Sequence, residues 1–200
     1  MGNIIAGFTM SLDGFIADAN DEVGRIMRWY RSGDTEVPVF DGAMVFKVSA
    51  ASAAVLRERF SGTGAIVTGR RDFDVSNAWG GQSPLPAPIF IVTHHPPQEW
   101  THAGSPFTFV TEGVERAVEL ARQAAGDKRI AIGSSTTTQQ CLQAGLLDEI
   151  EIDLVPILLG SGVRLFEHLG GPIELEQTSV VVAKDVTHLR YNVVKSSKAS

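Results

Sequence analysis

Short apolar runs alternate with helical stretches along most of this 200-residue chain, and this alternation constrains the fold more than any other feature. Strands that alternate with helices favour a largely parallel sheet covered by helices. Apolar residues at helical spacing predict helices over 48–59, 112–125 (with Thr111 as its N-cap) and 136–144. The expected strands are residues 4–9, 65–68, 89–93, 107–110, 130–132, 149–155, 174–183 and 188–194.

The end of the chain follows a different pattern. Two long strand-like runs are separated only by residues 184–186, which is typical of an antiparallel hairpin. In the preceding strand the acids Glu149, Glu151 and Asp153 alternate with apolar residues, which predicts one wet and one dry face. The sequence therefore predicts a three-layer α/β domain over residues 1–195, with a mixed, mostly parallel sheet and a C-terminal antiparallel hairpin. The Ser- and Lys-rich segment 196–200 is expected to fray.

Composition narrows the class of protein. Hydrophobic residues make up 44% and charged residues 20%, which is ordinary for a globular protein. We expect no membrane span and no secretory leader, because no apolar run of about 18 residues and no basic-then-apolar start occurs. A single cysteine, Cys141, fits a cytoplasmic protein. The net charge of −6 and the lack of a dense basic cluster argue against nucleic acid as a partner.

The segment 11–17, directly after the first apolar strand, is a candidate loop over a ligand. Asp13 stands beside Gly14 and carries the only charge between residues 1 and 17. Such an acid could position a proton or bind a polar substrate group. An ordinary Asp–Gly turn, in which Asp13 caps the loop, explains the same residues.

Two later strands end in residues suited to phosphate or ribose. Gly69 would let a phosphate approach the backbone, and Arg70 and Arg71 are planar, permanently charged donors. Thr93 and His94 end the next strand and offer a hydroxyl and an imidazole. The alternatives are solvated arginines at a helix start and plain loop histidines. No metal site is expected, because a lone His pair without acid or cysteine neighbours is a weak signal.

The turn 133–136 joins an apolar strand to a helix. Free amides at a helix N-terminus form an anion site, and the hydroxyls of Ser134, Ser135 and Thr136 beside Gly133 could add donors. Ordinary helix capping is the alternative. Neither a Walker A sequence nor a G-x-G-x-x-G fingerprint occurs, so dinucleotide binding would not use a Rossmann turn.

Four segments in order, 11–17, 66–73, 89–94 and 130–162, resemble the dihydrofolate-reductase-like superfamily, in the branch of the riboflavin-biosynthesis reductase domain. The resemblance implies NADPH as cofactor, phosphate contact at Gly69 and Arg70, contact of residues 93–94 with the adenosine 2′-phosphate or ribose, and a homodimer. The family normally has a second Gly where this chain has Ser134. The deaminase motifs H-x-E and P-C-x-x-C are absent, so the chain would supply at most a reductase step.

Two functions follow as hypotheses. The first is an NADPH-dependent reductase that delivers hydride to a small pteridine- or pyrimidine-type substrate, with Asp13 as the candidate catalytic group. The second is a non-catalytic nucleotide-binding module of the same fold.

Two expectations concern other parts of the chain. Residues 20–46 are interpreted as an insert that could either cover a pocket or form a surface loop packed by its own aromatic residues. Three valines in a row, 180–182, add a reason to expect a homodimer, since one must face outward.

Overall fold

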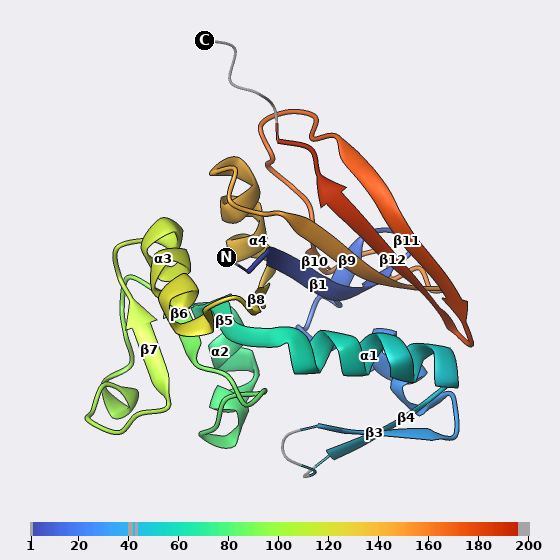
Figure 1. Ribbon diagram of the computed structural model, residues 1–200, viewed down its shortest axis with the longest axis horizontal. Coiled ribbons are helices and arrows are strands. Elements are labelled where there is room, and N and C mark those ends of the chain that lie inside the picture. Colours follow the sequence, from blue (N-terminus) through green and yellow to red (C-terminus); the bar gives the residue numbers. More distant parts are fainter. Residues whose placement is uncertain (1, 40–41, 43, 196–200) are drawn as a thin grey trace.

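An eight-stranded sheet in the order β11-β12-β9-β1-β8-β5-β6-β7 forms the centre of the molecule (Figure 1). The computed structural model describes residues 2–39, 42 and 44–195, so the segment 196–200 lies outside the described residues. The six strands from β9 to β7 are parallel, and β12 and β11 continue the sheet antiparallel. The strands are β1 (Ile4–Ser11), β5 (Thr63–Gly69), β6 (Ile89–Val92), β7 (Phe107–Val110), β8 (Arg129–Ile132), β9 (Glu149–Val155), β11 (Leu175–Ala183) and β12 (Val186–Val193).

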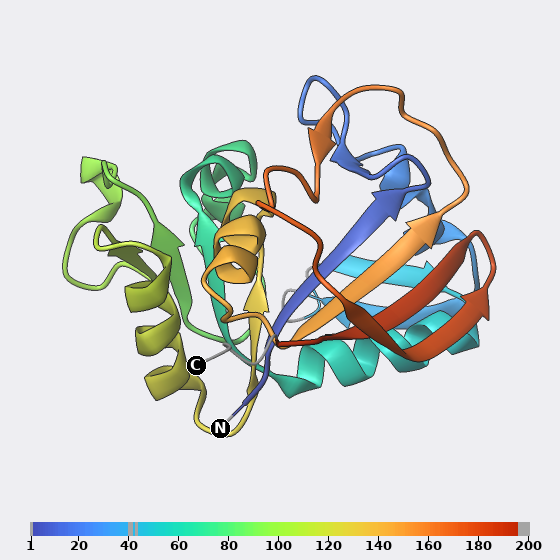
Figure 2. The same cartoon turned by 90° about the horizontal axis from the view of Figure 1, so that it is seen from above.

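Helices cover both faces of this sheet and complete the three layers. On one face α3 (Val114–Ala125) and α4 (Ser135–Gln143) enclose the largest apolar cluster. The other face carries two further clusters, one under α1 (Ala50–Gly62) and one under α2 (Arg70–Val75). Figure 2 shows α3 and the β11–β12 hairpin at opposite ends of the molecule. The predicted three-layer α/β fold is confirmed.

Short elements fill the connections. The segment that the sequence leaves open, 20–46, forms the 3₁₀ helix η1 (Ile26–Arg31) and the first strand of a hairpin, β3 (Thr35–Val39) with β4 (Met44–Val48). Trp29 of η1 is only 1% exposed and packs under α1, so η1 is part of the core. The remaining elements are β2 (Phe15–Ala17), β10 (Val163–Arg164), η3 (Asn77–Gly80) and η4 (Gln98–Trp100).

Two local expectations are wrong. Helix α3 begins at Val114 with Gly113 as N-cap, because the Thr111 hydroxyl instead donates to the neighbouring carboxylate of Glu112. In β9, Glu151 and Asp153 are 2% and 1% exposed, so the acidic face of this strand is not wet. Helix α1 covers that face and supplies a cation to it, which alternation along a single strand could not reveal.

Candidate active site

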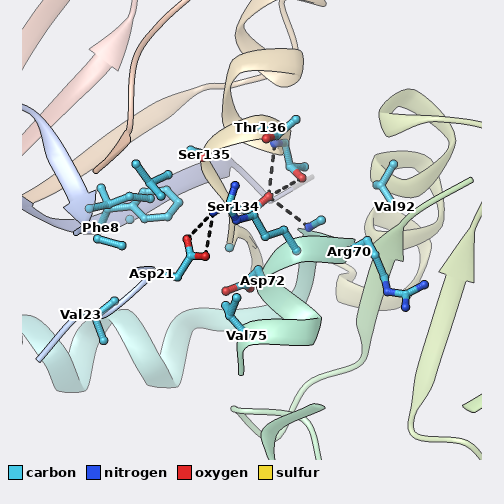
Figure 3. Close-up of a pocket in the computed structure, with 18 of the residues that line it drawn as sticks. Phe8, Asp21, Val23, Arg70, Asp72, Val75, Val92, Ser134, Ser135 and Thr136 are labelled. Carbon is cyan, nitrogen blue, oxygen red and sulfur yellow. Dashed lines mark hydrogen bonds and ion pairs between the residues drawn. The ribbon is translucent and has the colours of Figure 1, made fainter. Parts of the chain in front are cut away.

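A cavity of about 720 Å³ opens where β1 and β8 separate (Figure 3). Pairing of β1 with β8 ends at Ala6 and Ile132, whereas pairing of β1 with β9 continues to Ser11. One edge of β1 beyond Ala6 therefore has no neighbouring strand. Ligand sites in open α/β sheets lie at the carboxyl ends of strands where such openings occur.

The free edge of β1 offers backbone groups to the cavity. Ile130 N donates to Asn3 O on one side of this strand, and Asp148 N donates to Ile4 O on the other. Since backbone groups of successive residues in a strand face alternate sides, those of Gly7 and Thr9 face the opening. Both residues line the cavity.

The nine residues predicted to bind a cofactor all line one half of this cavity, here termed the cofactor half. They come from three neighbouring parallel strands, whose carboxyl ends meet at one edge of the sheet. These residues are Gly69, Arg70 and Arg71 after β5, Thr93 and His94 after β6, and Gly133, Ser134, Ser135 and Thr136 between β8 and α4.

Ser134 organises the centre of the cofactor half (Figure 3). It is the N-cap of α4, and its hydroxyl accepts from Thr137 N at 3.3 Å and from Gly69 N at 3.1 Å. A Cβ at Gly69 would lie 2.9 Å from the Ser134 hydroxyl oxygen, and one at Gly133 would lie 3.0 Å from that of Thr68. A side chain at either turn would therefore force the Ser134 or the Thr68 hydroxyl to shift.

The donors of the cofactor half fit a phosphate-bearing cofactor. The amides of Ser135 and Thr136 belong to the first turn of α4, where backbone N–H groups have no intrahelical acceptor. Ser135 and Thr136 also carry hydroxyls, and Arg70 and Arg71 line the cavity as well. Amide, hydroxyl and guanidinium donors together form a typical anion-binding set.

Both arginines already have acidic partners. Arg70 Nε donates to the two oxygens of Asp74 at 2.7 and 2.9 Å, and its side chain extends away from Ser134 (Figure 3). Arg71 Nη2 donates to both oxygens of Asp21 at 2.8 Å, and this hydrogen bond raises the pKa of Arg71. Asp21 also lines the cavity, so this pair ties the segment after β2 to α2.

A carboxyl group lies within the cofactor half as well. Asp72 lines the cavity beside the β5 turn and accepts a hydrogen bond of 2.7 Å from the Thr68 hydroxyl. Burial raises the pKa of Asp72 to about 6, although the hydrogen bond opposes this. Sequence reasoning missed this residue, because an acid beside two arginines is unremarkable in the sequence.

Asp13 does not line the cavity. Its carboxylate accepts from the Ser11 hydroxyl at 2.6 Å, from Leu159 N at 3.1 Å and from Gly160 N at 2.7 Å. The Ser11 hydroxyl and the two amides hold the pKa of Asp13 at about 2. These contacts are those of a cap that joins two loops, the alternative role for Asp13.

The other half of the cavity has a buried ionic floor, here termed the polar floor, made of Thr9, Tyr30, Arg59 and Asp153. Thr9 and Asp153 are directly opposite in the β1–β9 ladder. Arg59 of α1 donates from Nη1 and Nη2 to Asp153, and its Nε lies 2.7 Å from Glu151. Burial alone would raise the pKa of Asp153, but Arg59 and His188 lower it to about 2, so the carboxylate is charged.

His188 supports the polar floor from β12. Its Nδ1 lies 2.7 Å from Asp153 Oδ1, and its Nε2 lies 2.9 Å from the Ser52 hydroxyl. Ser52 is buried and is not among the residues that line the cavity, so this Ser–His–Asp chain has no reactive hydroxyl facing a ligand.

Sequence analysis did not find the polar floor, although a signal was present. Glu151 and Asp153 alternate along β9, and Arg190 and His188 alternate along β12 in matching order. In adjacent antiparallel strands such complementary charges can face each other on one side of a sheet. Together with Arg59 they predict a buried ionic layer in place of a wet face.

Comparisons with known proteins identify a matching family and similar folds. The model of the RibD C-terminal domain family matches residues 3–189. The structure is similar to a putative riboflavin biosynthesis protein from Shewanella sp. PV-4, with a TM-score of 0.70, 24% identity, and coverage of 97% of this chain and 99% of that chain. No curated protein matches the sequence.

Two further solved structures share the fold. A diaminohydroxyphosphoribosylaminopyrimidine deaminase/5-amino-6-(5-phosphoribosylamino)uracil reductase from Thermotoga maritima matches with a TM-score of 0.63 and 12% identity over 96% of this chain and 57% of that chain. Dihydrofolate reductase from Enterococcus faecalis, complexed with NADP(H), matches with a TM-score of 0.57 and 13% identity over 96% of both chains.

Proposed function

Because this chain belongs to the RibD C-terminal domain family, we propose that it is an NADPH-dependent reductase acting on a small pteridine- or pyrimidine-type substrate. One observation carries the proposal: a single cavity joins a half rich in phosphate donors to a half with a buried polar floor. That arrangement suits a cofactor and a substrate placed side by side at the free edge of β1. NADPH would supply the hydride.

The residues of the cofactor half have defined roles in this proposal. Arg70 and Arg71 pair with phosphate, and the first turn of α4 at Ser135 and Thr136 donates to the pyrophosphate. Thr93 and His94 contact the adenosine 2′-phosphate or the ribose. Gly69, Gly133 and Ser134 shape the two turns so that the backbone can approach the ligand. Asp13 holds the loop after β1 in place.

The proposal also includes a cellular location and an oligomeric state. We place the protein in the cytoplasm as a homodimer with a small-molecule substrate. No helix among the described residues is long and apolar enough to cross a membrane.

A second candidate is a non-catalytic nucleotide-binding module of the same fold. The Ser134 hydroxyl takes up the Gly69 amide, and both arginines are paired with acids. Each of these contacts competes with a phosphate ligand, so weak or altered cofactor use is the consequence to test.

One pair of measurements separates these candidates. Titration with NADPH and then NADH, followed by ligand fluorescence, measures cofactor preference. NADPH oxidation is then followed with dihydropteridines and ribosylaminopyrimidines as substrates. Preference for NADPH with turnover supports the reductase, whereas tight binding without turnover on any substrate supports the binding module. Failure of both cofactors to bind would contradict the two candidates together.

A further inference from the structure

The Arg59–Asp153 pair is the most deeply placed ionic contact of the cavity. The side chain of Asp153 is 1% exposed and that of Arg59 is 16% exposed, and both line the cavity on the side away from the phosphate donors. A charged pair that reaches a cavity from within the core is costly to bury, so its remaining hydrogen-bonding groups matter.

Those remaining groups can be counted. Asp153 Oδ1 accepts from His188 Nδ1 at 2.7 Å and from Arg59 Nη2 at 3.1 Å, which uses both of its lone pairs. Asp153 Oδ2 accepts one bond, from Arg59 Nη1 at 2.8 Å. Among the described residues, the second lone pair of Oδ2 and the second N–H of Nη1 have no protein partner.

This leaves one acceptor and one donor side by side, on atoms 2.8 Å apart. A ring lactam presents the complementary pattern, an N–H next to a C=O. We propose that Arg59 and Asp153 are the specificity-determining pair of the site and bind the lactam edge of the substrate's heterocycle. This inference rests on the proposed function, which places the substrate in this half of the cavity.

The charges of the polar floor favour a neutral ligand edge. The Arg59 guanidinium is shared by Asp153 and by Glu151, whose Oε2 lies 2.7 Å from Nε. Glu151 also pairs with Arg129 and Arg190, and Arg190 pairs with Glu58 as well. The three guanidinium groups of this cluster therefore face three carboxylates, which leaves no excess positive charge for a phosphate or carboxylate. A lactam needs no excess positive charge, because Arg59 and Asp153 together can make both of its hydrogen bonds.

Neighbouring residues make the pair rigid and give it an apolar surround. His188 fixes the Asp153 carboxylate, and Tyr30 is stacked between Trp29 and Phe46 at centroid distances of 4.1 and 4.0 Å. The apolar residues Val23 and Met27 line the cavity, and Met27 packs against the same apolar cluster as Trp29 and Tyr30. A flat ring between apolar walls with a fixed polar pair at one edge is a typical small-molecule site.

The test uses pterin and 3-methylpterin, which differ at the lactam N–H. Each is titrated into the full chain without cofactor by isothermal calorimetry. We expect pterin to bind at least about tenfold more tightly, since a hydrogen bond to a charged group contributes that much or more. Equal affinities would overturn the proposal.

Variants separate hydrogen bonding from simple crowding by the methyl group. In Asp153→Asn the preference for pterin should fall to within about threefold, because the charged acceptor is lost, whereas steric exclusion of the methyl would persist. Glu58→Gln is the matched carboxylate-to-amide control: Glu58 is exposed on α1, next to Arg59, and pairs with Arg190 outside the cavity. It should keep the full preference. An unchanged preference in Asp153→Asn, with folding verified by circular dichroism, contradicts the proposal.

The comparison in the parent protein decides the matter even if Asp153→Asn does not fold. Binding is measured without NADPH, so the outcome is independent of catalysis. Selective pterin binding with no NADPH oxidation supports the Arg59–Asp153 contact while the reductase proposal fails. NADPH oxidation with equal affinity for both pterins overturns the contact while the reductase proposal stands.

Discussion

Ser134 occupies the position where the family normally has a second glycine. Its hydroxyl makes two hydrogen bonds that a glycine could not make. It caps α4 and occupies the amide of Gly69, a group that a bound phosphate would otherwise take. The same side chain therefore stabilises the helix and competes with the proposed ligand.

We expect Ser134→Gly to fold and to bind NADPH as tightly as the parent or more so. Replacing an N-cap Ser by Gly costs only about a few tenths of a kcal/mol, and the change frees the Gly69 amide. Fluorescence titration measures affinity, and a thermal melt checks folding. Ser134→Ala, which keeps the Cβ, separates the effect of the hydroxyl from that of space. A large loss of affinity in both variants would show that the hydroxyl itself binds the cofactor.

Arg70→Ala should weaken NADPH binding more than NADH binding. A charge-assisted hydrogen bond to phosphate contributes roughly 1.5–3 kcal/mol, so the loss should be about tenfold or more. Because Arg70 is paired with Asp74, this effect requires the guanidinium to leave that partner. Dissociation constants for the two cofactors measure the difference. If NADPH and NADH binding weaken equally, Arg70 does not bind the 2′-phosphate.

The substitution Asp13→Asn tests whether Asp13 caps the loop or takes part in catalysis. Both carboxylate oxygens accept hydrogen bonds, from Ser11 and from two backbone amides, and an asparagine would turn an N–H toward one of these donors. We expect the melting temperature to fall while turnover stays within about a few-fold of the parent. A loss of turnover near 10²-fold without a change in melting temperature would restore the catalytic role.

At the scale of elements, α2 carries an acid that makes stability depend on pH. The pKa of Asp72 is about 6 in the folded protein against an ordinary value of 3.8. Below about pH 3 the carboxyl is protonated in both states. As pH rises toward 6 only the unfolded state ionises freely, so the parent protein loses stability across this window.

Asp72→Asn removes that dependence, since an amide does not titrate. We expect the variant to match the parent near pH 3 and to exceed it above pH 6, by at most about 3 kcal/mol. Urea unfolding at a series of pH values measures this. Asp74→Asn, on the same helix but exposed and paired with Arg70, should gain nothing at neutral pH. Lower stability of Asp72→Asn at pH 7.5 would show that the fold needs the ionised carboxyl.

The elements also show what a sequence can and cannot reveal. Apolar periodicity located the eight strands of the sheet and three of its helices. The spacing of apolar residues within each element reflects which of its side chains are buried. That the nine candidate residues line one cavity was predictable for the same reason, since each turn follows directly from the strand before it in the sequence. The polar floor was not, because the burial of Asp153 depends on Arg59, which is 94 residues away in sequence. Likewise, only the contacts of Asp13 with Leu159 and Gly160 distinguish its two proposed roles, a catalytic group and a loop cap.

At the scale of the whole molecule, the separation of β1 from β8 divides the sheet into two parts. The part from β8 to β7 leads into the turns of the cofactor half, and the part from β1 to β11 supplies Thr9 and Asp153 of the polar floor. Each part has its own cluster on the α1–α2 face, whereas the α3–α4 cluster spans both. The shared α3–α4 cluster therefore holds the two halves of the cavity in one core.

The outer hairpin leads to the last prediction, that the protein is a homodimer. Val181 lies across from His188 on the face covered by α1, so Val180 and Val182 point to the opposite face, where they are 45% and 76% exposed. Exposed apolar side chains on an edge strand favour burial by a second copy. Light scattering at micromolar concentration should give a dimer for the parent and a monomer for Val182→Asp. Val45→Asp, the same change at an exposed valine of the β3–β4 hairpin, should remain a dimer. A monomeric parent would contradict the prediction, and a dimeric Val182→Asp would move the interface away from β11.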